Sequence, residues 1–462
     1  MFSLAEETIA ALATPPGEGG IGIIRISGSN SFEVAKKIFR SRKVNFDEIK
    51  SRYLYHGHII DPFEEKIIDE VLLTCMKAPH TYTREDVVEI NCHGGIIPIK
   101  ETLEVIYSHG VRPAEPGEFT KRAFLNGRLD LTQAEGVIDL ITSKTDMLKD
   151  VALDQVQGKL KGKVEYIKEN LMTIMANLEA KIDFPEEDIE VLDDEELAKI
   201  AAYVLDDVKE LIASYDKGKI IREGIKTVIV GKPNVGKSSL LNKLLGENRA
   251  IVTDIPGTTR DTIEEAINLD GIPLNIIDTA GIRKAKDEVE KIGVDRTREL
   301  MEQAELILVI IDSSEPLSTE DIETLEMCKN KTSIVLLNKS DLEQNVNEDD
   351  INKLIESKNV LSISALKSEG IDELKRLINN LVFEGIAYQE DSLIITNTRQ
   401  YSSLKTAEQD IEKAYDALIN FLSEDLISID IKNALESIDE MTGDNISENV
   451  IDEIFSRFCI GK

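Results

Sequence analysis

Short runs rich in Val, Ile and Leu recur in the first 120 residues, and such runs are typical of strands. Two further segments of this part carry apolar residues at every third or fourth position, which predicts amphipathic helices. We expect three strands and two helices in this part, over residues 21–26, 71–76 and 87–90 and near residues 31–40 and 96–109. The pattern therefore predicts a mixed α/β domain over residues 1–120.

The pattern changes from residue 121 onward, where apolar residues recur at helical spacing among Lys, Glu, Asp and Gln. This spacing covers four segments, namely residues 121–140, 146–181, 195–215 and 400–458. Pro185 interrupts the spacing within an acidic run over residues 183–188. We interpret that run as a solvated loop between two long helices rather than as a metal site.

Short β-branched runs and helical segments alternate between the two helical stretches, as they do in a doubly wound parallel sheet. We therefore expect one helical domain in two parts, over residues 121–217 and 385–462, interrupted by an inserted α/β domain over residues 218–384. Inserted domains are tolerated when their own termini lie close together, and a doubly wound sheet meets that condition.

The composition changes this picture mainly through charge. The chain has 462 residues, 42% of them hydrophobic and 31% charged, which fits two to four globular domains. Its formal net charge of −33 opposes nonspecific binding to nucleic acid or to anionic membranes. A role in RNA chemistry would therefore require a local basic patch or a partner that carries the RNA.

The cysteines and the N-terminus predict a soluble, cytoplasmic protein. The cysteines are far apart and form no C-x-x-C pair, which argues against a disulfide scaffold or a zinc site. Glu6 and Glu7 stand where a signal peptide would be basic, and the longest apolar run, residues 306–311, is too short to span a bilayer. The four cysteines are Cys75, Cys92, Cys328 and Cys459.

The candidate chemistry is concentrated in Gly231-Lys-Pro-Asn-Val-Gly-Lys-Ser-Ser239, which fits the phosphate-binding pattern G-x-x-x-x-G-K-[ST] between a strand and a helix. The glycines let backbone N–H groups surround the β-phosphate of a nucleotide. Lys237 would add positive charge at the β and γ oxygens, and Ser238 would hold Mg²⁺. The nucleotide contacts expected from this loop are Asn234, Val235, Gly236, Lys237, Ser238 and Ser239.

Two motifs downstream of this loop lie where a γ-phosphate sensor belongs, namely Pro256-Gly-Thr-Thr-Arg-Asp261 and Asp278-Thr-Ala-Gly281. Thr259, in the first, is the candidate for a second Mg²⁺ ligand. Asp278, in the second, can reach Mg²⁺ through water, and the Gly281 N–H can meet the γ-phosphate. The contacts expected from this part are Thr253, Asp254, Ile255, Pro256, Gly257, Thr258, Thr259, Asp278, Thr279, Ala280 and Gly281.

Two later motifs address the base. Asp341, in Asn338-Lys-Ser-Asp341, can accept hydrogen bonds from N1–H and the exocyclic amine of guanine, an arrangement that adenine does not offer. Ser364-Ala-Leu366 follows a strand and can support guanine O6 from its backbone. Five motifs in this fixed order predict a GTP-binding domain. The contacts expected from the base motifs are Asn338, Lys339, Asp341, Ser364, Ala365 and Leu366.

The residue after Gly281 predicts an unusual mechanism of hydrolysis. Many GTPases place there a glutamine that positions the attacking water, whereas this chain has Ile282, which offers no hydrogen bond. Another group must therefore hold the water and compensate charge on the transferred phosphate. Arg260 and Arg283 are candidates only by proximity in sequence.

Two other glycine-rich segments carry no clear chemistry. Gly17-x-Gly19-x-x-Gly22 formally matches a dinucleotide-binding fingerprint, but these glycines precede a strand instead of opening a helix, so we reject that interpretation. His93-Gly-Gly95 follows the predicted strand over residues 87–90, and we expect a turn that exposes His93.

With these motifs in hand, the chain resembles the bacterial tRNA-modification GTPase family MnmE, also called TrmE, over essentially its whole length. The resemblance is carried by the five nucleotide motifs and by segments outside them. These segments are Ala13-Thr-Pro-Pro-Gly-Glu-Gly-Gly20 with Arg25, Asn91-Cys-His-Gly-Gly95, Arg112-Pro-Ala-Glu-Pro-Gly-Glu-Phe119, residues 122–135 and Phe458-Cys-Ile-Gly-Lys462.

The resemblance implies a function in tRNA modification. Members work as homodimers with a FAD-containing partner, MnmG, and install aminomethyl or carboxymethylaminomethyl groups on the wobble uridine of certain tRNAs. The one-carbon unit comes from a tetrahydrofolate derivative, in a 5-formyl or methylene form, bound in the N-terminal domain. The implied folate contacts are Arg25, Glu89, Arg128, which stands where some members have lysine, and Lys462. The acidic charge then fits a partner that presents most of the tRNA-binding surface.

The resemblance also implies how hydrolysis is activated and where the C-terminal cysteine lies. The family uses K⁺ as its charge-compensating group, which points to Asn234, Thr253, Ile255 and Thr258 here. Its water-positioning acid corresponds to Glu290. Without the resemblance, the sequence would favour a solvated carboxylate at this position. Cys459 would lie near the folate, with a catalytic role or as a small residue that anchors the tail.

Two other functional classes remain as alternatives. A ribosome-assembly GTPase would bind rRNA without modifying it, but the chain has no basic RNA-binding tail and the resemblance extends beyond the GTPase domain. A membrane-remodelling GTPase would need a basic amphipathic or apolar anchor, and none is evident. Co-sedimentation with ribosomal subunits and flotation with liposomes discriminate these classes.

Overall fold

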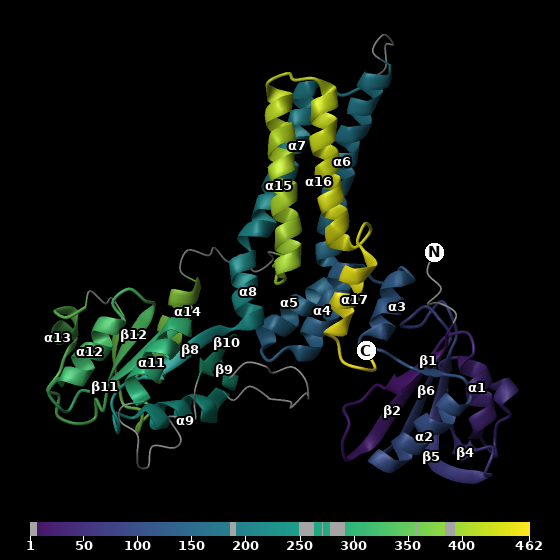
Figure 1. Cartoon of the computed structure of the whole chain (residues 1–462), viewed down its shortest axis with the longest axis horizontal. Coiled ribbons are helices and arrows are strands. Elements are labelled where there is room, and N and C mark those ends of the chain that lie inside the picture. The colour runs from purple at the N-terminus through teal and green to yellow at the C-terminus, as the bar shows by residue number, and fades with distance from the viewer. Residues whose placement is uncertain are drawn as a thin grey trace. The chain divides into compact units, whose positions relative to one another are not determined.

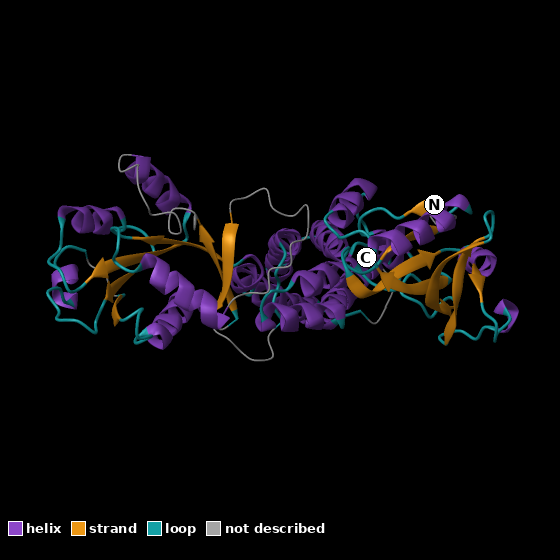
Figure 2. Ribbon diagram, turned by 90° about the horizontal axis from the view of Figure 1, so that it is seen from below, coloured by secondary structure: helices purple, strands orange, loops and turns teal. Residues whose placement is uncertain are grey.

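The structure is a computed structural model that describes residues 7–184, 191–248, 263–269, 271–277, 292–355, 359–383 and 393–462. Its Cα atoms group into two compact units. The first unit comprises Met1–Ile138, Gln155–Val191 and Ser423–Lys462, and the second comprises Asp139–Asp154 and Leu192–Leu422. Figure 2 shows that each unit combines helices with one sheet.

The first unit contains a seven-stranded sheet with the strand order β3-β4-β5-β6-β2-β1-β7. Neighbouring strands are antiparallel except for β7, which lies parallel to β1. Buried and exposed residues alternate along the longest strand, as expected for a sheet with one buried face. The strands are β1 Ile9–Leu12, β2 Gly19–Ser27, β3 Phe39–Arg40, β4 Leu54–Asp61, β5 Lys66–Met76, β6 Val87–Gly94 and β7 Arg112–Pro113.

Helices α1 (Ser31–Ile38) and α2 (Ile96–Ser108) pack on the same face of this sheet. Their apolar residues share one core with the inward-facing residues of β2, β4, β5 and β6. A short 3-10 helix, Phe46–Glu48, precedes β4. The opposite face of these two strands carries the polar side chains of Arg25 and Ser27 on β2 and of Glu89 and Asn91 on β6.

The helical part of the first unit packs around aromatic residues and one long helix pair. Phe124, Phe455 and Phe458 form a cluster with apolar residues of α4. Helices α6 and α16 lie side by side (Figure 1), and Lys168 joins them through Asp439 at 2.5 Å. The helices are α3 Glu118–Leu125, α4 Leu131–Thr142, α6 Lys159–Asp183, α16 Glu424–Thr442 and α17 Glu448–Ser456, with α4 divided between the units after Ile138.

The second unit contains a six-stranded sheet with the order β13-β12-β11-β8-β10-β9, parallel except for β9. Its inner strands are buried along their whole length except at Lys226 of β8, as expected for a parallel sheet covered on both faces. The strands are β8 Ile225–Val230, β9 Ile263–Leu269, β10 Ile272–Ile277, β11 Leu306–Asp312, β12 Ser333–Asn338 and β13 Val360–Ile363.

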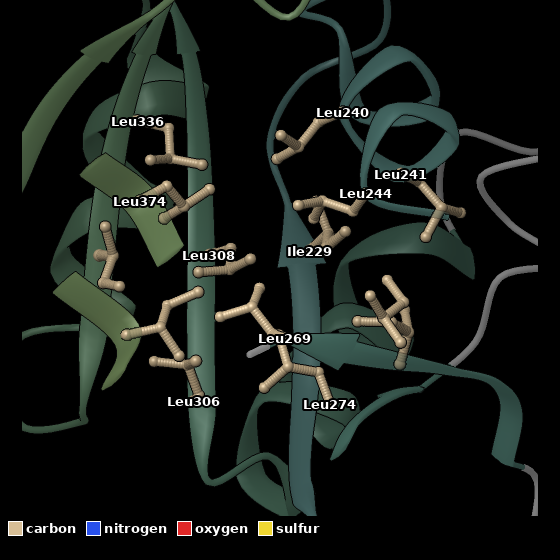
Figure 3. Close-up of a cluster of buried hydrophobic side chains, with 14 of the residues drawn as sticks. Ile229, Leu240, Leu241, Leu244, Leu269, Leu274, Leu306, Leu308, Leu336 and Leu374 are labelled. Carbon is tan, nitrogen blue, oxygen red and sulfur yellow. The ribbon is translucent and has the colours of Figure 1, made fainter. Parts of the chain in front are cut away.

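Two separate cores cover the two faces of this sheet. Helices α9 (Lys237–Asn248) and α14 (Ile371–Phe383) bury leucines and isoleucines on one face, and Figure 3 shows Leu240, Leu244 and Leu374 against the strands. Helices α11, α12 and α13, over Ile292–Gln303, Thr319–Met327 and Glu348–Asn352, cover the other face. This arrangement confirms the predicted doubly wound α/β fold.

The second unit also contains helices that precede and follow the sheet in the chain. Helices α7 (Asp194–Ala213) and α15 (Thr398–Ile419) form a close pair (Figure 1). Helix α8 (Tyr215–Glu223) leads into β8, and α5 spans Asp146–Val156. Asp139 accepts hydrogen bonds from Arg222 at 2.9 Å and Thr396 at 3.2 Å, so one buried carboxylate ties the entry to the exit of the sheet.

The structure differs from the sequence-based expectation at several places. Helical spacing over residues 146–181 belongs to two helices, because Gly158 adopts a left-handed conformation with φ of 85° between α5 and α6. The turn expected at His93 was wrong, because β6 continues through Gly94. His93 is nevertheless exposed, with Nδ1 2.6 Å from the buried Asp69 carboxylate.

Gly19 and Gly22 lie within β2 and open no helix, which confirms the rejection of a dinucleotide fingerprint. No helix in the described part of the chain is long and apolar enough to cross a bilayer. The division into domains over residues 1–120, 121–217, 218–384 and 385–462 stays a prediction.

Candidate functional site

The phosphate-binding motif forms the loop between β8 and α9. Gly231 and Gly236 have φ values of 146° and 108°, and a Cβ on either would collide with its neighbours. That Cβ would lie 2.3 Å from the Ile310 carbonyl oxygen or 2.2 Å from Asn338 Nδ2. Asn234 also has a positive φ, 65°. The loop therefore curls tightly at the C-terminal edge of the sheet, with its backbone at the N-terminus of α9, which favours anions.

Asn338, at the end of β12, ties the phosphate loop to the last of the base motifs. Its Nδ2 donates to the Val235 carbonyl at 2.7 Å, and its Oδ1 accepts from the Ala365 N–H at 3.0 Å. Asn338 is only 3% exposed, so both bonds are shielded from water. The next residue, Lys339, pairs with Asp312 at the end of β11. Three loops that are distant in sequence are thus fixed relative to one another.

Asp341 presents a carboxylate beside this junction. Its Oδ1 accepts from Ser364 Oγ at 2.7 Å, and Lys367 Nζ lies 4.0 Å from its Oδ2. The Ser364 hydrogen bond lowers the pKa of Asp341 below its usual value. The carboxylate therefore stays ionised and acceptor-only, as guanine recognition requires. Leu366 is 84% exposed, so any role it has must come from its backbone.

Lys237 occupies the centre of the phosphate loop. Its Nζ donates to the Lys232 carbonyl at 2.7 Å and also to the Gly231 carbonyl. Burial lowers the pKa of Lys237, because the charged form loses hydration there. Ser238 and Ser239 at the helix start are exposed. The ammonium is therefore held near the loop backbone, where a phosphate could replace the two carbonyls.

The motifs expected to sense the γ-phosphate lie outside the described residues. They comprise Thr253, Asp254, Ile255, Pro256, Gly257, Thr258, Thr259, Arg260, Asp278, Thr279, Ala280, Gly281, Ile282, Arg283 and Glu290.

A second group of polar residues lies in the first unit, and we call Arg25, Tyr82, Glu89 and Arg128 the arginine–tyrosine cluster. Arg25 and Glu89 face each other on β2 and β6 and form an ion pair of 2.8 Å. The Arg25 Cζ lies 5.7 Å from the Tyr82 ring centroid and 5.6 Å from that of Phe119. The Arg128 Cζ lies 4.5 Å from the Tyr82 ring, and Arg128 donates to the Tyr82 carbonyl at 3.0 Å. Two guanidiniums and one carboxylate thus gather around a single aromatic ring.

A buried ionic network fixes the segment that carries Tyr82. The Tyr82 hydroxyl lies 3.0 Å from the Thr120 hydroxyl of α3. Glu85, three residues on, accepts from Arg122 at 3.1 Å, and Arg122 also donates to Glu118 at 2.9 Å. Arg122 and Glu118 are each 4% exposed. Such a pair is costly to break, so the network holds this segment firmly against α3.

Residues 459–462 pack against β1, next to the strand that carries Arg25. The Gly117 N–H donates to the Cys459 carbonyl at 3.3 Å, and the Lys462 N–H donates to the same oxygen at 3.3 Å. Gly461 has φ of 91°, and a Cβ there would lie 2.1 Å from the Leu12 carbonyl oxygen. No larger residue than glycine fits this contact without a shift.

The cysteines differ in accessibility. Cys75 and Cys92 are buried in the first unit, and burial raises the pKa of each thiol to about 12. Cys328 is buried in the second unit. Cys459 alone among the four is half-buried rather than buried. It is therefore the cysteine best placed to meet a ligand.

Comparison with known proteins covers almost the whole chain. The family model described as the GTP-binding protein TrmE N-terminus matches residues 8–128. The family model described as the MnmE helical domain matches residues 131–459. A tRNA modification GTPase MnmE from Natranaerobius thermophilus is 58% identical, over 99% of this chain and 100% of its own. Proteins of the same name from Clostridioides difficile and Alkaliphilus oremlandii are 51% and 50% identical, each over 99% of both chains.

The chain belongs to the MnmE family of tRNA modification GTPases.

In this MnmE family member, the structure brings together most of the residues predicted from sequence that it describes. The phosphate loop and both base motifs meet at Asn338, and Arg25, Glu89 and Arg128 meet at Tyr82. The resemblance alone did not indicate Tyr82 or the ring of Phe119 as part of that group. In the structure both rings lie beside the Arg25 guanidinium. No spacing in the sequence, however, links these two residues to β2.

Proposed function

We propose that this MnmE family member hydrolyses GTP and, with a FAD-containing MnmG-like partner, modifies the wobble uridine of tRNA. The added aminomethyl or carboxymethylaminomethyl group would draw one carbon from a tetrahydrofolate derivative. The observation that carries the proposal is the arginine–tyrosine cluster beside residues 459–462, in a chain that also fixes its phosphate and base loops through Asn338. Tetrahydrofolate combines a planar pterin with carboxylates, and such a ligand matches aromatic and guanidinium groups.

The geometry of the loops in the second unit supports GTP binding there. The left-handed glycines leave room where a Cβ would stand, so the backbone of the phosphate loop can approach an anion closely. In this proposal the backbone of residues 234–239 and the Lys237 side chain bind the phosphates. Asp341 and the backbone of residues 364–366 bind the guanine. Mg²⁺ would be held by Ser238 and Thr259, and it would neutralise charge on the β and γ oxygens.

K⁺ is the proposed charge-compensating cation, held by Asn234, Thr253, Ile255 and Thr258, with Glu290 holding the attacking water. We expect GTP hydrolysis to be at least about tenfold faster in KCl than in NaCl of equal ionic strength, because a fixed cation stabilises the transferred phosphate. Measuring phosphate release in both salts, with intact protein and with Glu290→Ala, checks this. The variant should bind GTP normally and hydrolyse it about 10²-fold more slowly in KCl. Equal rates in both salts would contradict the role of K⁺. An unchanged rate of hydrolysis in Glu290→Ala would contradict the role of Glu290.

Folate binding is proposed for the arginine–tyrosine cluster, with Arg25, Glu89, Arg128 and Lys462 as contacts and Cys459 nearby. Arg25→Gln should weaken tetrahydrofolate binding about 10- to 100-fold, because it removes a charge-assisted hydrogen bond from a site only 18% exposed. Isothermal titration with a reduced folate measures the change. Lys36→Gln is the matched control, since it removes one positive charge from an exposed ion pair between α1 and the 3-10 helix. Equal affinities for Arg25→Gln and Lys36→Gln would contradict the folate site.

The chain's charge supports a division of labour with the partner. A net charge of −33 opposes direct capture of tRNA, so we propose that an MnmG-like protein supplies most of the tRNA-binding surface. We further propose a homodimer that brings two GTP-binding domains and two folate-binding domains together. Sedimentation of the purified chain, alone and with its partner, measures both associations. A monomer under all nucleotide conditions would contradict the homodimer.

The experiment that tests the whole proposal is nucleoside mass spectrometry of tRNA from cells that lack this gene. We expect the wobble-uridine modification to disappear and to return when the intact gene is restored. Unchanged tRNA would contradict the proposal and would make ribosome assembly the leading account, which co-sedimentation with ribosomal subunits would then test.

A further inference from the structure

The residue after the first glycine of the phosphate loop, Lys232, forms an ion pair that phosphate binding does not require. The pattern G-x-x-x-x-G-K-[ST] leaves this position open, because the loop binds phosphate through its backbone N–H groups. In the structure, the Lys232 side chain reaches α12, where its Nζ lies 2.8 Å from Asp321 Oδ2. Lys232 is 17% exposed and Asp321 only 2%. A charge pair this well shielded from water is not an ordinary surface salt bridge.

Asp321 is itself fixed to the start of α12. Its Oδ2 accepts from the Ser318 N–H at 3.0 Å and from the Ser318 hydroxyl at 2.8 Å, which completes a capping box at the helix N-terminus. The helix follows β11, the strand next to β8 in the sheet. The carboxylate that Lys232 meets is therefore part of a rigid element rather than of a flexible loop.

Lys232 also connects this rigid element to the centre of the loop. Its carbonyl accepts from Lys237 Nζ at 2.7 Å, so its main chain supports Lys237 while its side chain is held by α12. Three loop residues, Gly231, Asn234 and Gly236, have positive φ values. Such a backbone needs its surroundings to hold it in place.

We propose that the Lys232–Asp321 ion pair tethers the phosphate loop to α12 and so positions the loop and Lys237 for GTP. This inference rests on the GTP site proposed above, and it makes Lys232 a positioning residue that acts through the loop backbone. The hydrogen bond to Asp321 raises the pKa of Lys232, with further support from Glu315 and Glu320, so the lysine remains charged. The tether acts on the loop rather than on one phosphate, so it should serve GDP and GTP alike.

The test measures the affinities of purified full-length protein for fluorescent GDP and GTP analogues. Lys232→Met and Asp321→Asn should each raise Kd for both nucleotides by about tenfold, the loss of one well-shielded contact, mainly through faster dissociation. Lys232→Arg should bind like the intact protein, because its guanidinium can reach the same carboxylate. The double variant should bind both nucleotides as weakly as each single variant, because each change removes the same tether.

Ser318→Ala provides the matched control. It removes the hydroxyl of the same capping box and should lower the melting temperature, while it leaves the ion pair and the nucleotide Kd unchanged. Two results would overturn the tether. Unchanged nucleotide affinity in both Lys232→Met and Asp321→Asn would leave the pair a purely stabilising contact. Full recovery of affinity in the double variant would show that the lysine only neutralises the carboxylate.

Lys237→Ala separates failure of the tether from failure of the proposed site. If Lys237→Ala loses nucleotide binding while Lys232→Met and Asp321→Asn retain it, the site stands and the tether is wrong. If Lys237→Ala binds nucleotide like the intact protein, the GTP site itself is wrongly placed.

Discussion

Lys237→Ala is expected to weaken GTP binding about 10³-fold and to abolish restoration of the wobble-uridine modification in cells that lack the gene. The lysine lies at the centre of the phosphate loop and is held by two loop carbonyls. Burial lowers its pKa, so a bound phosphate would restore favourable surroundings to the charged form. Truncating one partner of a buried charge pair typically costs about 2–5 kcal/mol, which corresponds to a factor of this size.

The measurement has two parts, namely a nucleotide titration and nucleoside mass spectrometry of tRNA after complementation. Lys219→Ala is the control, because it removes an exposed lysine on α8, in the same unit. We expect the control to bind GTP normally and to restore the modification fully. A Lys237→Ala variant that fails to bind GTP yet restores modification would separate the tRNA chemistry from the nucleotide.

Asp341→Asn is expected to reverse base preference, lowering affinity for GTP about 10³-fold and favouring xanthosine triphosphate. A carboxylate can only accept hydrogen bonds, and guanine offers two donors in one direction, N1–H and the exocyclic amine. An asparagine presents one acceptor and one donor, which suits xanthine because a carbonyl replaces the amine there. Sites built on such hydrogen bonds reject a mismatched partner strongly.

The structure makes this substitution a fair test. Ser364 donates to Asp341 at 2.7 Å, and an asparagine oxygen can accept the same bond, so the loop should keep its conformation. Competition of GTP and xanthosine triphosphate against a fluorescent GDP analogue measures the preference. Glu343→Gln, an exposed acid-to-amide change two residues away, should leave the preference unchanged. An Asp341→Asn variant that still prefers GTP would place guanine elsewhere.

The fold of the nucleotide-binding sheet could be predicted because its motifs lie at the ends of strongly apolar strands. Buried strands such as β11 and β12 are continuous apolar runs, and each motif follows its strand directly. The first unit was harder to predict. The segment Ile9–Leu12 contains two alanines and shows no alternation, and β4 contains a glycine and two histidines. These segments become strands only because they pair with neighbouring strands, and the β-propensities of single residues do not predict such pairing.

The candidate sites also differ in how far the sequence predicts them. The phosphate and base residues follow from spacing within short motifs, whereas the arginine–tyrosine cluster joins β2, β6 and the segment around Tyr82. The resemblance supplied Arg25, Glu89 and Arg128, but the aromatic ring between the two arginines required the tertiary structure. The role of Lys232 was hidden for a related reason, since Lys232 lies in the phosphate loop and its partner Asp321 lies in helix α12, 89 positions further along the chain. Tertiary contacts of this kind leave no local signal in the sequence.

The contact between Gly461 and Leu12 sets an order for assembly during synthesis. A ribosome makes β1 early, then the helices and the complete nucleotide-binding sheet, and only afterwards residues 458–462. A nascent chain can therefore hold a finished phosphate loop while the neighbourhood of Arg25 still lacks its last segment. Guanine nucleotide binding would mature first, and the surface at β1 would close only when translation has passed the codon for Gly461. Such timing would delay completion of the surface around Arg25 until after the nucleotide-binding sheet has formed.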